Sequence, residues 1–501
     1  MVVDSPAVIH ELPPEYEPVQ IRSSMTVVVA SFGFFLLCFI GVGIVSATRR
    51  KNTTDDYLLA SRSVSPWVMA LSAVATNNSG FMFIGLIGAT YSEGISSLAM
   101  MAGWVLGDYV AWLFGIPKAL REKSEQRGAA TIPSFLGQGL VGGQNVAKVA
   151  GLIVLAFLGT YAGAQLTAGS KALHALFGWD MFVGAVLGAL IVVAYCFSGG
   201  IRASIWTDVA QSIVMFVSMN LLLLVGVSEA GGPAALWASL EAIDPQMLSF
   251  VPASAPFGFG MFLLGWLAAG FGVVGQPHIM IRAMAIDSPE NMPAARRVYV
   301  VWNVLFSISA VGVGLVARLL LNETSGFDPE LAMPSLSMHL LHPVLVGLVL
   351  AGLFAATMST ADSQVLSCSA AITQDLLPRP GASHYYNKVG TVIVTLIVLA
   401  VALAGSSVFA LVVLAWSGMA ASLGPLLVIR CTNRSVTSGT ALAMMIGGLL
   451  SVLGWKYGLG YGTGLNEALP GMLMGFVIYG IGSTIGRSTG SGSSSTNLSD
   501  S

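Results

Sequence analysis

An apolar segment at residues 66–91 loses its apolar character at its midpoint. Both flanks, PWVMALSAV and FMFIGLIGATY, are apolar enough to lie in lipid, whereas the centre, ATNNSG (residues 75–80), is small, polar and a poor helix former. Polar backbone at membrane depth is stable only where protein or a water-filled cavity surrounds it. The segment therefore predicts a broken membrane helix, and broken helices of this kind bind solutes and ions near the bilayer midplane.

Composition supports a membrane setting for this segment. Only 9% of the 501 residues are charged and 55% are hydrophobic, whereas a soluble domain carries about 25% charged residues. The mean hydropathy is +0.80. A net charge of −2 gives no indication of nucleic-acid binding, and the four cysteines and six histidines show no metal-ligand spacing.

Long apolar stretches recur along the whole chain. Because each membrane helix needs about 20 such residues, the sequence predicts an all-α polytopic membrane protein with about 13 transmembrane helices. The predicted spans are residues 25–46, 66–91, 96–117, 146–172, 180–199, 206–228, 256–281, 298–320, 343–372, 388–404, 407–429, 437–457 and 468–486.

Basic residues lie mainly in every second loop between these spans. Most of the 22 lysines and arginines therefore share one face, which the positive-inside rule assigns to the cytoplasm. We expect a multi-pass protein of the plasma (inner) membrane, with the N-terminus outside and the C-terminus in the cytoplasm. The terminal segments are an extracytoplasmic polar tail (1–24), a first helix with its cytoplasmic loop (25–65) and a disordered cytoplasmic tail (487–501).

A second interrupted span lies at residues 256–281. It is rich in glycine, and Pro277 would break a straight helix near its inner end. The two broken spans are the second and the seventh, and they enter the membrane from opposite sides, as an inverted five-helix repeat predicts. Two tightly packed glycine-rich helices are the alternative. The predicted units are a first repeat (66–228), an outer loop (229–255), a second repeat (256–429) and two C-terminal helices (430–486).

The ninth span offers oxygen ligands for a cation. Ser359, Asp362 and Ser363 are spaced to lie on one helical face. Thr360 adds a neighbouring hydroxyl. Sodium requires several oxygen ligands, and an acid within a membrane span is a functional hypothesis by default. Alternatively, the hydroxyls bond back to their own helix and Asp362 lies near the inner interface.

Asp208 begins the sixth predicted span. An acid at a helix N-terminus is favoured by the helix dipole alone. The alternative is a second cation ligand or a proton acceptor near the cytoplasmic exit.

Several motifs together resemble the sodium/solute symporter family. They cover about residues 45–460 in the family's order, and they are Ala60-Ser61-Arg62-Ser63, the run from Leu71-Ser72-Ala73 to Gly85-Leu86-Ile87-Gly88-Ala89, Gly199-Gly200-Ile201-Arg202 with Trp206-Thr207-Asp208, Gly275-Gln276-Pro277-His278-Ile279 with Arg282-Ala283-Met284-Ala285, and Ala356-Thr357-Met358-Ser359-Thr360. The resemblance implies a LeuT-like inverted-repeat core and sodium-driven uptake of a solute.

The resemblance also implies particular binding residues. The main sodium site matches Ala75, Asn78, Ala356, Ser359 and Thr360. A second cation or proton site, present in some members, matches Asp208, Asp362 and Ser363. The expected substrate contacts are Asn77, Ser79, Gly80, Phe81, Tyr161, Gln165, Ala269, Val273 and Pro277.

The sequence departs from the family's proline-transporting members within this pocket. Those members carry an essential aspartate where this chain has Asn77, and a tryptophan where it has Phe81. Ala269 and Val273 stand where they carry a substrate-contacting tryptophan and tyrosine. An amide offers a carbonyl but no charge, so we expect sodium affinity to depend on a carboxylate elsewhere. Trp266 could compensate for the lost aromatic residues or serve in packing.

We therefore expect a symporter that couples inward sodium movement to uptake of a small organic solute, a proline-like amino acid or a small carboxylate. Na⁺ is the only metal ion expected, and no cofactor is. The alternatives are a proton-coupled symporter that uses Asp208 or Asp362, and a transporter-derived sensor. An enzyme is disfavoured because His278 has no matched catalytic partner. The expected partners are the solute, Na⁺ or H⁺ and the lipid bilayer, with no nucleic acid, and a monomer is expected.

Overall fold

The computed structural model describes residues 18–48, 51, 53–253, 255–321, 326–378, 384–404, 407–461 and 464–491. Within these residues the chain is helical and has no strand, apart from one isolated parallel bridge between Val64 and Ile286. Most of the tail expected at 1–24 and residues 492–501 of the expected C-terminal tail lie outside the described residues.

Helices fill both expected repeats. The first half of the chain contains α1 (Pro18–Ala47), α2 (Thr54–Leu59), η1 (Ala60–Arg62), α3 (Pro66–Gly80), η2 (Phe81–Leu86), α4 (Ile87–Glu93), α5 (Ser96–Leu113), α6 (Ile116–Gln126), α7 (Ile132–Gly137), α8 (Gly143–Ile153), η3 (Val154–Leu158), α9 (Gly159–Phe177), α10 (Met181–Glu229), α11 (Pro233–Ile243) and η4 (Pro245–Leu248).

The second half contains α12 (Phe259–Phe271), η5 (Gly272–Gly275), α13 (Pro277–Ala285), η6 (Pro289–Asn291), α14 (Met292–Leu320), η7 (Pro329–Leu331), α15 (Ala332–Leu340), α16 (Pro343–Ala370), η8 (Ala371–Leu376), α17 (His384–Leu403), α18 (Val408–Cys431), α19 (Ser438–Leu453), η9 (Gly454–Gly458) and α20 (Ala468–Ser491).

Many of these helices are suited to a bilayer. In the described part of the chain, 9 helices are long and apolar enough to cross a membrane, or up to 11 if each of two bent pairs is one span. The bent pairs are Ser96–Leu113 with Ile116–Gln126 (45°) and Phe259–Gly275 with Pro277–Ala285 (54°), and two shorter apolar helices are Met181–Ala194 and Ala468–Thr484. The expected count of thirteen spans stays a prediction.

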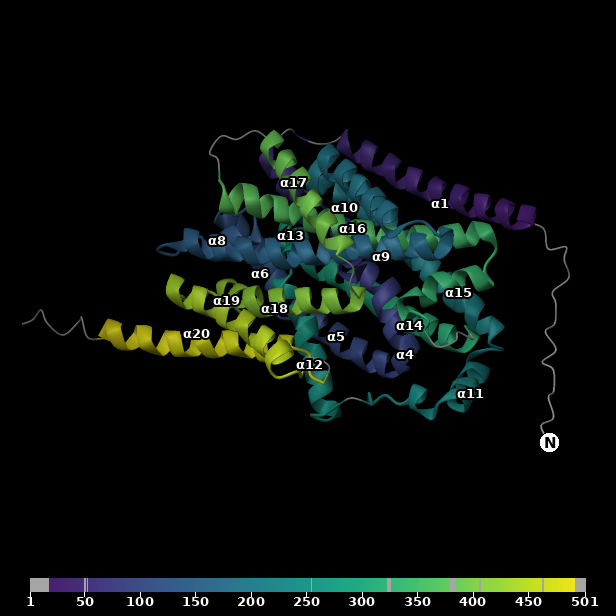
Figure 1. Ribbon diagram of the computed structural model, residues 1–501. Coiled ribbons are helices and arrows are strands. Elements are labelled where there is room, and N and C mark those ends of the chain that lie inside the picture. The colour runs from purple at the N-terminus through teal and green to yellow at the C-terminus, as the bar shows by residue number, and fades with distance from the viewer. Residues whose placement is uncertain are drawn as a thin grey trace, which may run out of the picture.

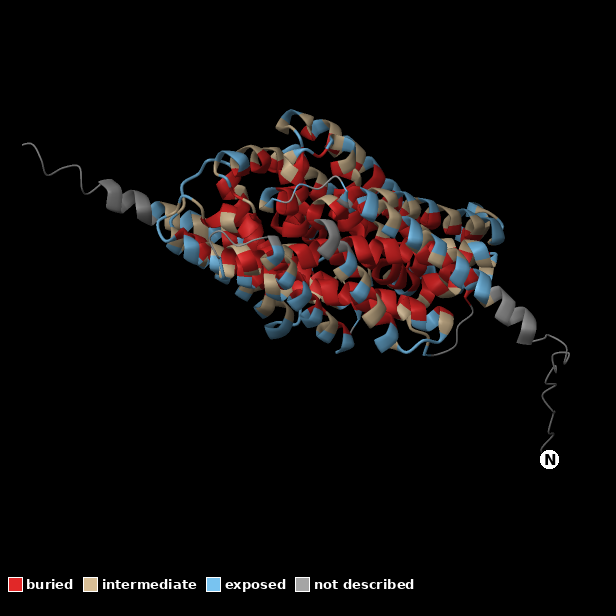
Figure 2. Cartoon of the chain, turned by 90° about the horizontal axis from the view of Figure 1, so that it is seen from above, coloured by how far each residue is buried: buried red, intermediate tan, exposed pale blue. Residues whose placement is uncertain are grey.

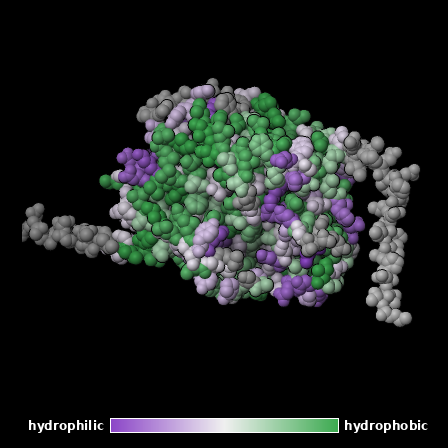
Figure 3. All heavy atoms as spheres, in the orientation of Figure 1, coloured by the Kyte–Doolittle hydropathy of each residue, from purple (hydrophilic) through white to green (hydrophobic). Residues whose placement is uncertain are grey.

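The helices form a bundle with a buried centre and an apolar outer surface. The most apolar 18-residue window of Pro66–Glu93 is 94% buried, against 22% for the window of Met25–Ser46. The segment with the polar midpoint therefore lies inside the bundle, while α1 runs along its edge (Figure 1). Buried residues fill the middle of the molecule (Figure 2). Hydrophobic side chains cover a broad part of the face in Figure 3, as lipid contact requires.

The spans expected at 180–199 and 206–228 form one long element, α10, which breaks at Gly200. This glycine has a φ of 59° and a ψ of −150°, a combination that L side chains rarely adopt. A Cβ at this position would also lie 2.6 Å from Cδ2 of Tyr57 in α2. The break therefore lets the loop helix α2 approach the backbone of α10 closely.

An ion pair fixes the same contact. Arg202 of α10 donates to both carboxylate oxygens of Asp56 in α2, at 3.1 Å from Nε to Oδ1 and 3.3 Å from Nε to Oδ2. Burial favours the neutral acid, but hydrogen bonds from Arg202, Ser61 and the Lys51 backbone N–H outweigh it and lower the pKa of Asp56. Asp56 is therefore a charged anchor between α2 and α10.

A second carboxylate connects three elements at the opposite end of the bundle. Glu330 in η7 accepts hydrogen bonds from the Ser407 hydroxyl (2.7 Å) and from the backbone N–H groups of Val408 (3.2 Å) and Phe409 (3.1 Å). These groups form the N-terminus of α18, where a negative charge is favoured. Lys171 of α9 pairs with Glu330 at 2.6 Å. Glu330 thus holds α9 and α18 to the loop before α15.

Candidate functional site

The helix break expected in the second span lies at Ser79. α3 is helical up to this residue, which has a φ of 47° and a ψ of 179°. A serine at positive φ costs about 1–3 kcal/mol and persists only where the surroundings impose it. Ser79 is fully buried. The break is therefore sharper than the polar run Thr76–Gly80 suggested, and it lies inside the protein rather than against lipid.

Two hydroxyls of α16 donate to backbone carbonyls just before this break. Ser359 Oγ lies 3.4 Å from the Ala75 carbonyl and 3.1 Å from the Ala356 carbonyl of its own helix. Thr360 Oγ1 donates to the Thr76 carbonyl at 3.0 Å. The hydroxyls of Ser359 and Thr360 thus join α16 to α3 just before the break.

Asn78 lies directly before the break. Its carbonyl accepts the Phe81 N–H across the break, and its side chain donates to the Val74 carbonyl at 2.9 Å. None of the hydrogen bonds of the described residues joins it to Ser359 or Thr360. The structure therefore brings Ala75, Ala356, Ser359 and Thr360 together, with Thr76 as a neighbour that the sequence did not single out.

The second break separates α12 from α13. Gln276 is extended (φ −99°, ψ 98°), and Pro277 is the first residue of α13, as the sequence predicts. The Ala269 carbonyl, near the end of α12, accepts a hydrogen bond from Trp416 Nε1 at 2.7 Å. Val273 is fully buried. Trp416 of α18 was not expected, because a tryptophan in an apolar span usually indicates packing.

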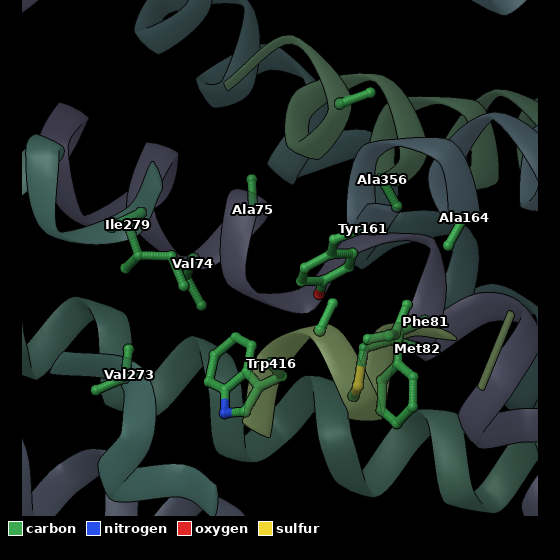
Figure 4. Packing of buried hydrophobic residues seen from close by; sticks show 14 of the residues in the cluster. Val74, Ala75, Phe81, Met82, Tyr161, Ala164, Val273, Ile279, Ala356 and Trp416 are labelled. Atoms are coloured by element: carbon green, nitrogen blue, oxygen red, sulfur yellow. The ribbon is translucent and has the colours of Figure 1, made fainter. Parts of the chain in front are cut away.

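Polar side chains of α9 meet the break in α3. Tyr161 Oη lies 3.2 Å from Ser79 Oγ. Gln165 Oε1 accepts the Gly80 N–H at 2.8 Å, and a Cβ at Gly80 would lie 2.6 Å from Thr357 Cγ2. Gly80 therefore permits the close approach of α9 and α16. Figure 4 shows Tyr161 beside this bend of α3, with Trp416 entering from α18.

Aromatic rings form a wall on the other side of the break. Phe81 stacks with Trp104 of α5 (ring centroids 5.9 Å apart) and contacts Phe409 of α18 (5.3 Å). Trp104 in turn contacts Trp266 (5.7 Å) and Trp416 (4.8 Å). Trp266 is therefore part of this aromatic group, and one face of the site is apolar.

The expected second cation site contains a cation supplied by the protein. Arg282 of α13 donates to Asp208 Oδ2 at 2.9 Å and to the Ser363 hydroxyl. Ser204 donates to Asp362 Oδ1 at 3.0 Å, and Asp208, Arg282 and Asp362 are fully buried. An arginine in the apolar stretch 277–285 was the sequence signal for this pairing. Asp208, Asp362 and Ser363 thus come together as expected, around a guanidinium.

A further buried acid, Asp108 of α5, was missed. It lies on the opposite side of α3 from Asp208, and it accepts from Asn77, Trp112, Tyr299 and Asn303. Its signal was present in the sequence, because an aspartate in the third apolar span, 96–117, is itself a functional hypothesis.

Several buried polar atoms around the break have no hydrogen-bond partner among the described residues. They include Asn77 Oδ1, Gln165 Nε2, Asp208 Oδ1, Asp362 Oδ2 and both ring nitrogens of His278. Buried polar atoms are usually paired, and each exception needs an explanation. Their concentration around the break in α3 is consistent with a site that binds polar ligands.

Residues 57–448 match the family model described as sodium:solute symporter family. The chain belongs to this family. It is 33% identical to the high-affinity proline transporter PutP of Bacillus subtilis (strain 168), over 86% of this chain and 91% of that protein. It is 32% identical to the sodium/proline symporter of Escherichia coli (strain K12), over 92% and 93% of the two chains.

Solved structures support the fold. A Na⁺-coupled sialic acid symporter in a substrate-bound outward-open state has a TM-score of 0.77 and 18% identity, covering 92% of this chain and 98% of that one. MhsT in complex with L-phenylalanine has a TM-score of 0.55 and 13% identity, covering 83% and 98%. These likenesses confirm the all-α, LeuT-like inverted-repeat fold.

Family membership decides the general activity. The protein is a sodium-coupled solute symporter, a multi-pass protein of the cell membrane, and not an enzyme. Sodium is the coupling ion, and a small-molecule solute is its co-substrate. The proton-coupled and sensor alternatives are not favoured by these relatives.

Proposed function

We propose that sodium and a small zwitterionic amino acid bind at the break in α3 and are carried inward by alternating access. In this proposal Ala75, Asn78, Ala356, Ser359 and Thr360 bind the main sodium ion. The residues proposed to contact the solute are Asn77, Ser79, Gly80, Phe81, Tyr161, Gln165, Ala269, Val273 and Pro277.

The convergence of α16 hydroxyls on α3 carbonyls carries this proposal. Ser359 and Thr360 donate to the carbonyls of Ala75 and Thr76. If both hydroxyls rotate, their lone pairs and these carbonyls face one point, where a cation replaces the hydroxyl hydrogens. The ion then links α3 to α16. Because a ligand shifts a conformational equilibrium only by its differential affinity, sodium favours the state in which these helices lie together.

The residues around the break suit a solute with one charged end and one apolar side. Tyr161, Gln165 and the Gly80 N–H form the polar end. Rotation of the Gln165 side chain would free this N–H for a carboxylate, since helix-terminal amides favour anions. Phe81 and its aromatic neighbours form the apolar wall. The relatives named as proline transporters make proline the first solute to test, although the wall differs from theirs.

In this proposal the second expected cation site is less favourable for an ion than the main sodium site. A cation at Asp208, Asp362 and Ser363 would have to displace the Arg282 guanidinium, which lies 2.9 Å from Asp208. A pocket beside this group is lined by Tyr57, Ile201, Pro277, Arg282 and Ser363. We infer that ion and solute leave past this pocket into the cytoplasm.

The remaining assignments follow from the same cycle. We propose an N-terminus outside and a C-terminus in the cytoplasm, two inverted repeats at 66–228 and 256–429, and a monomer as the transporting unit. The basic residues that follow the odd-numbered spans support this orientation.

Uptake into proteoliposomes tests the proposal. Labelled proline, other amino acids and small carboxylates are offered with and without an inward sodium gradient. We expect sodium-stimulated uptake of at least one zwitterionic amino acid, and its loss when Ser359→Ala is combined with Thr360→Ala. The matched control is Thr395→Ala, which removes a buried hydroxyl that donates to the Thr391 carbonyl of its own helix. Wild-type sodium dependence in the double variant contradicts the proposed site.

A further inference from the structure

Asp108 is a buried acid in the membrane-embedded helix α5. Among the described residues it has no basic partner. Its side chain is 1% exposed, and none of the ion pairs or hydrogen bonds of the described residues joins it to lysine, arginine or histidine. An ionised carboxylate at membrane depth is costly unless a cation or a functional ligand offsets it. Asp208, on the other side of α3, has Arg282. The charge of Asp108 has no such counterpart.

Asp108 and two polar groups beside it form a small triangle. Asn77 Nδ2 donates to Asp108 Oδ2 (3.1 Å) and to Tyr299 Oη (2.6 Å), and Tyr299 Oη donates to Asp108 Oδ2 (2.7 Å). These atoms come from α3, α5 and α14. Trp112 holds the other carboxylate oxygen from its own helix at 3.1 Å. The donors fix the carboxylate in place but supply no net positive charge.

The Asn77 amide has one oxygen that accepts no hydrogen bond from the described residues. Asn77 is 8% exposed, and its Oδ1 has no partner among the described residues. Oδ1 and Nδ2 belong to one planar amide, so a half-turn about the last side-chain bond exchanges them. After that turn, the amide oxygen, Asp108 Oδ2 and Tyr299 Oη form a triangle of oxygens. Such a group, with one full negative charge, is a ligand set for a hard cation.

From this geometry we propose that Asp108, Asn77 and Tyr299 bind a second sodium ion. The inference rests on the proposed sodium-coupled function, and it adds an ion-binding site to it. The bound ion neutralises Asp108 and replaces the two hydrogen bonds that Asn77 Nδ2 gives up when the amide turns. Thr76 and Asn77 are adjacent in α3, yet Thr76 faces α16 and Asn77 faces α5 and α14. The two ions would therefore hold the broken segment from opposite sides.

Sodium activation of uptake tests this site. Wild-type protein should show cooperative activation with a Hill coefficient approaching about 2, the number of sites. Asp108→Asn should lower it to about 1 and raise the half-activating sodium concentration by about tenfold. Asn77→Asp combined with Asp108→Asn moves the carboxylate across the 3.1 Å contact, and it should restore activation toward wild type. Asp55→Asn is the matched control, because Asp55 is exposed on α2.

Direct binding separates this inference from the proposed function. Purified protein with both Ser359→Ala and Thr360→Ala should still bind radioactive sodium, and further substitution of Asp108 by asparagine should remove that binding. This result needs no solute and no uptake. If wild-type liposomes show no sodium-stimulated uptake while this binding persists, the proposed function fails and the second site stands. The same binding assay applies if Asp108→Asn alone does not reach the membrane.

Three results overturn the inference. The first is unchanged sodium activation in Asp108→Asn, and the second is absence of sodium binding in the Ser359→Ala, Thr360→Ala protein. The third is a change in the pH dependence of uptake without a change in sodium activation, which would show that Asp108 carries a proton instead.

Discussion

Asp208 and Asp108 lie on opposite sides of the broken helix α3 and differ in their partners. Both are fully or almost fully buried. Asp208 is paired with Arg282 and accepts from Ser72 at 2.6 Å. Among the residues that the structure describes, Asp108 accepts from neutral donors alone. The comparison shows that burial by itself does not reveal the role of an acid. An acid with a permanent cation is already neutralised, whereas one without it retains the capacity to bind an ion.

The largest effect should come from separating the paired charges. Asp208→Asn removes the carboxylate that pairs directly with the buried Arg282 guanidinium, and breaking a buried pair typically costs about 3–5 kcal/mol. We expect a lower melting temperature in detergent and little uptake. Combining Asp208→Asn with Arg282→Gln should recover much of the stability, because neither charge then remains. A double variant as unstable as the single one would show that the broken ion pair is not the main cause of the lost stability.

Tyr299→Phe, next to the unpaired acid Asp108, should have an intermediate effect on sodium activation of uptake. It removes a hydrogen bond to a charged group, worth about 1.5–3 kcal/mol, and one of the oxygens of the proposed second sodium site. We expect the half-activating sodium concentration to rise several-fold while the protein stays folded. Thermal stability and sodium activation, measured on the same preparation, distinguish lost folding from lost ion binding.

Asp56 and Arg202 extend the comparison to an ion pair in the loop between α1 and α3. The pKa of Asp56 is held below its ordinary value of about 3.9, so its contribution to stability is present above that value and is lost as pH falls through the lower folded-state pKa. Asp56→Asn should therefore cost about 1–2 kcal/mol at neutral pH. The difference from wild type should disappear in the acid range below about pH 4. Melting curves across pH measure this, and a constant difference at all pH values would argue against an ionic cause.

The smallest effect should come from Asn303. Its Nδ2 lies 3.4 Å from Asp108 Oδ2, at the outer limit of a hydrogen bond. Asn303→Ala should therefore change stability by less than about 1 kcal/mol and leave sodium activation close to wild type. A loss as large as that of Tyr299→Phe would mean that Asn303 moves closer to the carboxylate when an ion binds.

Sequence patterns were sufficient to predict much of the fold. The polar midpoint of 66–91 and Pro277 correctly located both helix breaks, because membrane helices tolerate such residues only for a structural reason. Ser359 and Thr360 were also recognisable, since they follow a family motif, and the structure draws them to α3. The count of spans and the domain boundaries stay predictions.

The rest of the site depends on contacts between distant segments. The pairing of Arg282 with Asp208 and the triangle of Asn77, Asp108 and Tyr299 each join residues far apart in the chain. Helical periodicity shows which face a residue occupies but not which helix it meets. The contact between Gly200 and Tyr57 of α2 could likewise not be predicted, although the break at Gly200 does divide α10 near the boundary between the two expected spans.

Glu330 has a consequence for the speed at which one end of the bundle can open. Its carboxylate accepts hydrogen bonds from Lys171 of α9 and, at the same time, from the Ser407 hydroxyl and the first N–H groups of α18. If Glu330 stays with Lys171 when α18 moves away from α9, a hydroxyl and two backbone amides lose the same acceptor. These losses coincide, and water can replace them only after the gap has widened. Separation of the two helices is therefore a threshold event, with the intermediate positions less stable than either end state.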